Sequence, residues 1–149
     1  MGVNTMKKFA VGVLVFVLWT TLFTLVACSD ETDSITDTTW QWESVSDRPT
    51  GEITTVPDPE NYTLVFREDG TFSGQADCNQ ISGTYTQEGG FILTLGPSTM
   101  AFCGEDSLDK QYLELLGGVV TGGPDGAGGF ALEWAGSEKR MEFSNGGSG

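Results

Sequence analysis

The stretch "YTLVFREDGTFSGQADCNQISGTY", residues 62–85, decides the fold. Its first five residues alternate and place three large apolar side chains on one side of a strand: Tyr62, Leu64 and Phe66. Asp69–Gly70 is a tight-turn pair, and "TFSGQA" then returns as the second arm of a hairpin. A further turn at Cys78–Asn79 leads into "GTYTQ", which an "EGG" turn connects to "FILTL". The stretch therefore predicts two consecutive antiparallel hairpins.

Strand signals continue on both sides of these hairpins. Upstream, "TWQWESV" places Trp40 and Trp42 on one face of a strand, and the proline-containing residues 46–61 are expected to form a loop. Downstream, "FALEW" and "RMEF" predict two closing strands joined by the turn "AGSEK". The glycine-rich residues 122–129 are expected to form a long loop, and residues 145–149 a flexible tail.

One convincing helix is expected, in "DSLDKQYLELLGG", residues 106–118. Its apolar side chains fall on one helical stripe: Leu108, Tyr112, Leu115 and Leu116. Asp106 or Ser107 is suited to cap its start, and Gly117 to end it. Short strands with a single helix predict a mostly antiparallel α+β domain, with the helix stripe buried on the concave face of a curled sheet.

The N-terminus predicts export. Lys7 and Lys8 precede an uncharged run from Phe9 to Ala27, which is typical of a secretory signal. "LVAC" resembles the bacterial lipobox, so we expect cleavage after residue 27 and a lipid on Cys28; an uncleaved membrane anchor is the alternative. Residues 28–38 then form a polar linker. Because Ser29 follows Cys28, the outer membrane is the default destination in a cell with two membranes.

Composition narrows the possible functions. The sequence has no histidine, which excludes Ser–His and Cys–His catalysis and His-based zinc sites. It has 21 acidic residues against seven basic ones, and two of the seven lie in the signal. A domain this acidic repels nucleic acid and anionic lipid headgroups. No nucleic-acid partner is therefore expected.

The motifs "VPDPENYTLVFREDGTFSGQADCNQISGTY", "STMAFC" and "DSLDKQYLELL", in that order, resemble the META domain family, the HslJ-like bacterial lipoproteins. The resemblance covers residues 39–144. It implies a sheet curled into a partial barrel around one helix, with no catalytic residues and no cofactor. Family members are described as envelope-associated, some of them linked to heat stress, antibiotic tolerance or secretion.

Cys78 and Cys103 are expected to form a disulfide. No histidine is present to activate either thiol, and a structural zinc needs about four ligands. With Cys28 acylated, the two remaining cysteines are an even set in an oxidising compartment. The alternative is that Phe102, an extra residue relative to the commoner family spacing, turns Cys103 away and leaves two buried thiols.

Three functions remain open: a monomeric, non-enzymatic envelope domain that binds a protein or glycan, a carrier of a small apolar ligand, and a carboxylate hydrolase. The hydrolase would draw on four turn or strand carboxylates: Asp69, Asp77, Glu88 and Glu133. Asn79 is interpreted as a turn residue with a left-handed backbone, the alternative being an oxyanion donor. Trp40, Trp42 and Trp134 are expected in the core rather than as sugar platforms. Asp58 and Glu60 lack the spacing of a calcium loop, so no metal site is expected.

Overall fold

The computed structural model describes residues 34–149. Its strands are β1 (Thr38–Asp47), β2 (Glu52–Thr55), β3 (Tyr62–Phe66), β4 (Thr71–Ala76), β5 (Asn79–Thr86), β6 (Ile92–Leu95), β7 (Val119–Pro124), β8 (Phe130–Trp134) and β9 (Lys139–Ser148). Its helices are α2 (Asp109–Gly117) and the short 3-10 turns η1 (Pro59–Asn61) and η2 (Ala135–Ser137).

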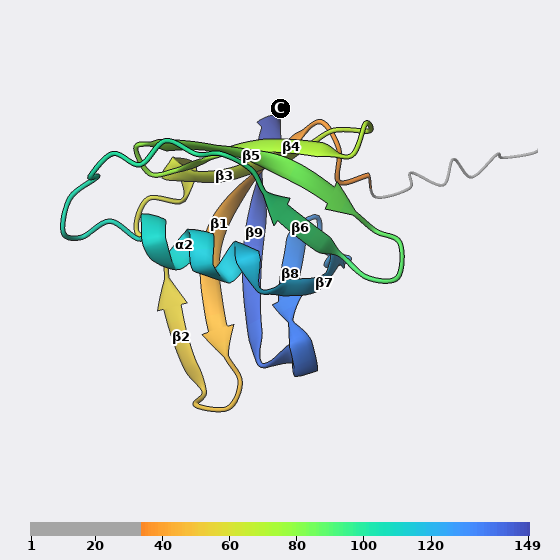
Figure 1. Ribbon diagram of the computed structural model, residues 1–149. Helices are drawn as coiled ribbons and strands as arrows, with labels where there is room; N and C mark the ends of the chain where they lie inside the picture. Colours follow the sequence, from red (N-terminus) through yellow and green to blue (C-terminus); the bar gives the residue numbers. More distant parts are fainter. Residues whose placement is uncertain (1–33) are drawn as a thin grey trace, which may run out of the picture. The chain divides into compact units, whose positions relative to one another are not determined.

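All the named strands join one antiparallel sheet in the order β6-β5-β4-β3-β1-β9-β8-β7, with β2 paired to β1. The sheet curls until its two ends meet, where the N–H of Phe91, the residue before β6, donates to Val120 C=O of β7 at 3.0 Å. Figure 1 shows the β3–β4–β5 layer at the top crossing over β1, β9 and β8, with α2 below this layer and in front of β1 and β9. The predicted fold class, a curled and nearly closed sheet with one α-helix, is confirmed for the described residues.

The two predicted hairpins are present. Tyr62 pairs with Ala76 and Phe66 with Phe72 across β3 and β4, so the turn lies at Asp69–Gly70 as expected. Gly70 has a φ of +79°, a backbone conformation that glycine adopts without strain. The alternation in β3 also holds, because its three large apolar side chains are all buried: Tyr62, Leu64 and Phe66.

Helix α2 is shorter than predicted. It begins at Asp109 with Leu108 in the N-cap position. The Leu108 side chain makes no capping hydrogen bond, but the hydroxyl of Ser107, one of the two predicted caps, accepts Asp109 N–H at 3.2 Å. Tyr112, Leu115 and Leu116 are buried as the stripe predicts, whereas Leu108 is only partly buried.

Aromatic packing connects α2 to the sheet. The Tyr112 ring stacks on Trp42 of β1 at 5.1 Å and meets Tyr62 of β3 edge-on at 5.7 Å. At the other end of the helix, Trp134 of β8 donates its indole N–H to Leu115 C=O at 2.7 Å. The helix is therefore held against both halves of the sheet. Trp40 and Trp42 are buried and Trp134 half-buried, consistent with their predicted core role.

Three segments form strands where loops or a tail are predicted. Residues 52–55, inside the predicted loop 46–61, form β2 and pair with the end of β1. Val119–Pro124 forms β7, so only residues 125–129 of the glycine-rich segment remain a loop. Residues 145–148, predicted as a flexible tail, complete β9 and pair with the start of β1. Neighbouring strands supply hydrogen-bond partners that the local sequence does not reveal, and this overrides weak strand propensity.

The predicted linker also enters the domain. The Ile35 side chain is buried, its carbonyl accepts the indole N–H of Trp40 at 2.9 Å, and Asp37 N–H donates to Phe66 C=O at 3.0 Å. The domain thus begins before residue 39, because the apolar side chain of Ile35, within the polar segment, packs in the core. Residues 28–33 of the predicted linker lie outside the described residues.

Candidate functional site

The site is built around a disulfide between Cys78 and Cys103, the pairing that the sequence predicts. Cys78 lies in a two-residue turn, Asp77–Cys78, because Ala76 at the end of β4 pairs directly with Asn79 at the start of β5. Cys103 lies in the loop before α2, and the two Cα atoms are 5.5 Å apart. Cys78 N–H also donates to Cys103 Sγ at 3.3 Å. The bridge fastens the loop before the helix to the tip of the hairpin.

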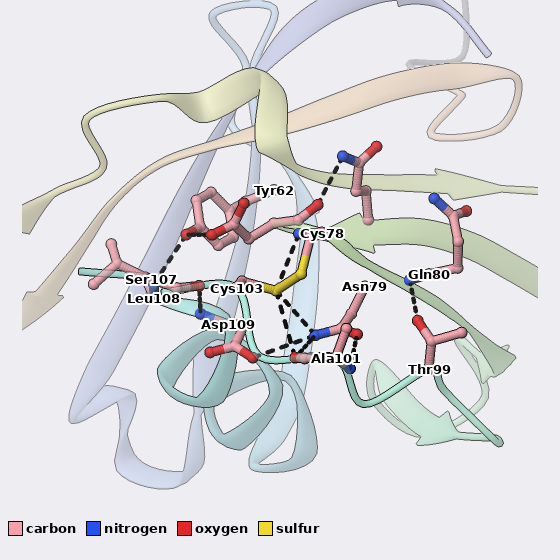
Figure 2. Close-up of a disulfide and its surroundings, with 12 residues drawn as sticks. Tyr62, Cys78, Asn79, Gln80, Thr99, Ala101, Cys103, Ser107, Leu108 and Asp109 are labelled. Atoms are coloured by element: carbon pink, nitrogen blue, oxygen red, sulfur yellow. Dashed lines mark hydrogen bonds between the residues drawn. A yellow bond between two sulfur atoms is a disulfide. The ribbon is translucent and has the colours of Figure 1, made fainter. Parts of the chain in front are cut away.

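Asn79 is not the turn residue that the sequence predicts. It is the first residue of β5, only 2% exposed, and the left-handed position in this turn is Asp77, with a φ of +56°. The Asn79 amide binds the backbone of Ala101 in both directions: Oδ1 accepts from Ala101 N–H at 2.7 Å and Nδ2 donates to Ala101 C=O at 3.1 Å. Nδ2 also lies 3.2 Å from Cys103 Sγ and 3.4 Å from Asp109 Oδ2 (Figure 2). The side chain serves as a clamp on the loop.

A third attachment fixes the same loop to β5. Gln80 N–H donates to Thr99 Oγ1 at 2.8 Å (Figure 2). In return, Thr99 N–H donates to Gln80 C=O at 3.2 Å. Residues 99–103, which we call the anchored segment, are thus held at Thr99, Ala101 and Cys103. The two residues between these attachments project into solvent: Met100 is 90% exposed and Phe102 is 78% exposed. Phe102 therefore points outward and does not turn Cys103 away from Cys78.

An acidic cleft of about 250 Å³ borders Cys103. Its lining includes four carboxylates and no basic side chain; the carboxylates are Asp58, Asp77, Glu105 and Asp106. Tyr62 also lines the cleft, and its hydroxyl accepts Leu108 N–H at 2.9 Å and donates to Asp77 Oδ2 at 3.4 Å. Within residues 34–149, no three acidic or cysteine side chains gather closely enough to hold a metal ion.

The four carboxylates considered for hydrolysis occupy separate places. Asp69 and Asp77 lie in the turns at opposite ends of β4, and Glu88 is exposed in the turn after β5. Glu133 on β8 forms an ion pair with Arg140 at 2.6 Å. Hydrogen bonds from the Thr71 hydroxyl and N–H lower the pKa of Asp69, opposite to the raised pKa that a general acid needs.

Sequence reasoning missed two features of this site: the clamp formed by Asn79 and the exposed pair Met100 and Phe102. A signal for the pair was available in "TMAFC", where apolar residues alternate with the three attached ones. The clamp had no local signal, since Asn79 and Ala101 are brought together only by the fold. Cys28, the expected lipid site, lies outside the described residues; within those residues no helix has the length and apolarity to cross a membrane.

Comparison with known proteins supports the resemblance seen in the sequence. The profile of the META domain matches residues 33–145, three quarters of the chain. A DUF4847 family protein from Bacteroides vulgatus, known from a crystal structure, is similar with a TM-score of 0.56 and 14% identity, over 74% of this chain and 93% of that one. A protein from Burkholderia xenovorans, solved by NMR, is similar with a TM-score of 0.58 and 24% identity, over 74% and 83%. No curated protein matches the chain. The two structures establish a shared fold.

Proposed function

Because the chain belongs to the META domain family, we propose that it is a non-enzymatic domain of the bacterial cell envelope that acts by binding another protein or a glycan at its surface. In this proposal a lipid on Cys28 holds the domain at the membrane, and residues 28–33 connect the lipid to the domain. The role is in envelope stress or maintenance.

The observation that carries the proposal is the filled interior of the barrel. The concave face of the sheet and α2 together bury a continuous set of large side chains, including Trp42, Leu64, Phe66, Tyr112, Leu116, Phe130 and Met141. Interiors packed in this way leave little room for a ligand of ordinary size, which would require a pocket of about 300–1,000 Å³. Recognition at the outer surface is therefore favoured over carriage of a small molecule inside.

The arrangement of carboxylates favours binding over hydrolysis. A glycosidase needs two carboxyl groups facing each other, about 5–10 Å apart, across a cleft. Asp69 and Asp77 are separated by the length of β4, and Glu133 is neutralised by Arg140. The acidic cleft beside Cys103 is better suited to attracting a cationic group from a partner than to acid–base chemistry.

Two measurements test the proposal. Intact-mass analysis of the protein from a membrane fraction should give a chain that begins at Cys28 and carries acyl groups; a mass that retains residues 1–27 would contradict the anchor. Formaldehyde crosslinking in the native envelope should give a reproducible adduct with a protein or glycan. If native mass spectrometry instead finds a small apolar molecule bound in a one-to-one complex and no adduct forms, the domain is a carrier.

A further inference from the structure

We propose that the anchored segment and the acidic cleft together form a docking surface for a protein that presents an apolar pocket next to lysine or arginine side chains. Met100 and Phe102 would enter that pocket, while a basic side chain of the partner enters the acidic cleft. The inference rests on the proposed function, and it specifies the surface and the class of partner.

The first argument is the exposure of two large apolar side chains close together. A single exposed apolar residue is normal on a protein surface. Here, however, Met100 and Phe102 are the two most exposed large apolar residues among those described, and they lie on one five-residue segment. Aromatic side chains and methionine are enriched where proteins meet.

The second argument is the rigidity of their support. The anchored segment is held by the disulfide at Cys103, by the Asn79 clamp at Ala101 and by the paired hydrogen bonds between Thr99 and Gln80. A loop fixed in this way loses little conformational freedom on binding, and such preorganisation strengthens an interface. If this loop served only to stabilise the fold through its disulfide, it would not need bulky apolar residues between its points of attachment.

The third argument is charge, which selects the partner. The acidic cleft shares Cys103 with the anchored segment, and its four carboxylates have no basic neighbour in the lining. Its volume, about 250 Å³, accommodates a lysine or arginine side chain. An anionic membrane surface would be repelled, and so would a second copy of this acidic chain. A protein with a basic rim is attracted, and charge complementarity of this kind speeds and orients association.

Site-specific photocrosslinking in the native envelope tests the surface. A benzophenone-bearing phenylalanine analogue replaces Phe102 in the full chain, or, as a matched control, replaces Ile53, which is 68% exposed on β2 away from the site. We expect a protein adduct at position 102 that is absent at position 53. A lipid adduct, a glycan adduct, a crosslink to a second copy, or no adduct at position 102 would overturn the inference.

Binding measurements with the identified partner, purified, complete the test. The full chain, purified from membranes in detergent, is compared with the variants F102S and E105Q/D106N; I53S and E68Q/E88Q are the controls. We expect each site variant to weaken Kd at least tenfold, added salt to weaken the wild-type complex, and the controls to bind as the wild type. Equal binding by F102S, or a Kd independent of salt, would overturn the inference.

The two proposals fail in different ways. If formaldehyde gives a protein adduct but position 102 gives none, the domain still binds a partner and the docking surface lies elsewhere. If neither experiment gives a protein or glycan adduct, the proposed function itself falls. Thermal unfolding of each variant confirms that it is folded, which is expected because all the substituted side chains are exposed.

Discussion

Replacing Asn79 by alanine tests the clamp that fixes the anchored segment. The substitution removes the two hydrogen bonds to Ala101, at 2.7 and 3.1 Å, and the longer contacts to Cys103 and Asp109. Each net hydrogen bond contributes about 1 kcal/mol, and the site is nearly inaccessible to water, so we expect a loss of about 2–4 kcal/mol in the free energy of unfolding.

Urea unfolding of the oxidised protein at pH 7 measures this loss, with Gln80→Ala as the matched control. Gln80 is the next residue, is exposed and contributes to the site through its backbone alone, so its substitution should cost less than about 0.5 kcal/mol. Asn79→Asp should cost at least as much as alanine, because its carboxylate would face the Ala101 carbonyl and Asp109. If Asn79→Ala unfolds at the same urea concentration as the control, the clamp is not what holds the segment.

Four further outcomes are expected. Replacing Cys78 and Cys103 by alanine should lower the free energy of unfolding by about 3 kcal/mol, the loop entropy for a separation of 25 residues, and equal urea midpoints would contradict it. Tyr112→Phe should stabilise the protein by about 1 kcal/mol, because the Tyr112 hydroxyl is buried without a partner among the described residues; a marked loss of stability would reveal a hidden partner. Leu115→Ala should cost about 2–5 kcal/mol because Leu115 is buried, whereas an unchanged midpoint would mean that α2 lies loosely on the sheet. Asp69→Asn should flatten the acid side of the pH–stability profile. Because the pKa of Asp69 is lowered in the folded protein, its carboxylate contributes stability above the ordinary pKa of 3.8, and this stability is lost as the pH falls through the folded pKa. Identical profiles for the variant and the wild type would contradict this expectation.

The hairpins and the helix were predictable because their signals are local. The alternation in β3, the Asp69–Gly70 turn and the stripe on α2 each depend on residues close together in the chain. The end of β9 was not predictable. Its glycine-rich sequence has little strand propensity, and its partner in β1 lies about a hundred residues away.

The candidate site was predicted in part for the same reason. Counting cysteines was enough to propose the disulfide, because only one pair remains after Cys28. Assigning Asn79 to the turn placed the left-handed residue two positions too late: the turn is Asp77–Cys78, and an asparagine beside a turn resembles a turn residue in sequence alone. The exposure of Phe102 depends on the attachments of the loop before α2 at Thr99 and Cys103, on either side of it (Figure 2). These attachments could not be predicted from local sequence, because they form only when the fold brings β5 and this loop together.

The order of strands in the sheet has a consequence for when the domain can fold. From β3 to β6, and again from β7 to β9, each strand pairs with its neighbour in sequence. The first strand, β1, lies between these two halves: it pairs with β3 on one side and with β9, the last strand, on the other (Figure 1). Forming this β1–β9 pairing closes the chain from Thr38 to Ser148 into a loop, and such distant pairing slows folding. The β1–β9 pairing cannot form until β9 is present in the same compartment as β1. If the chain is exported as we propose, the sheet would be completed only after β9 has crossed the membrane.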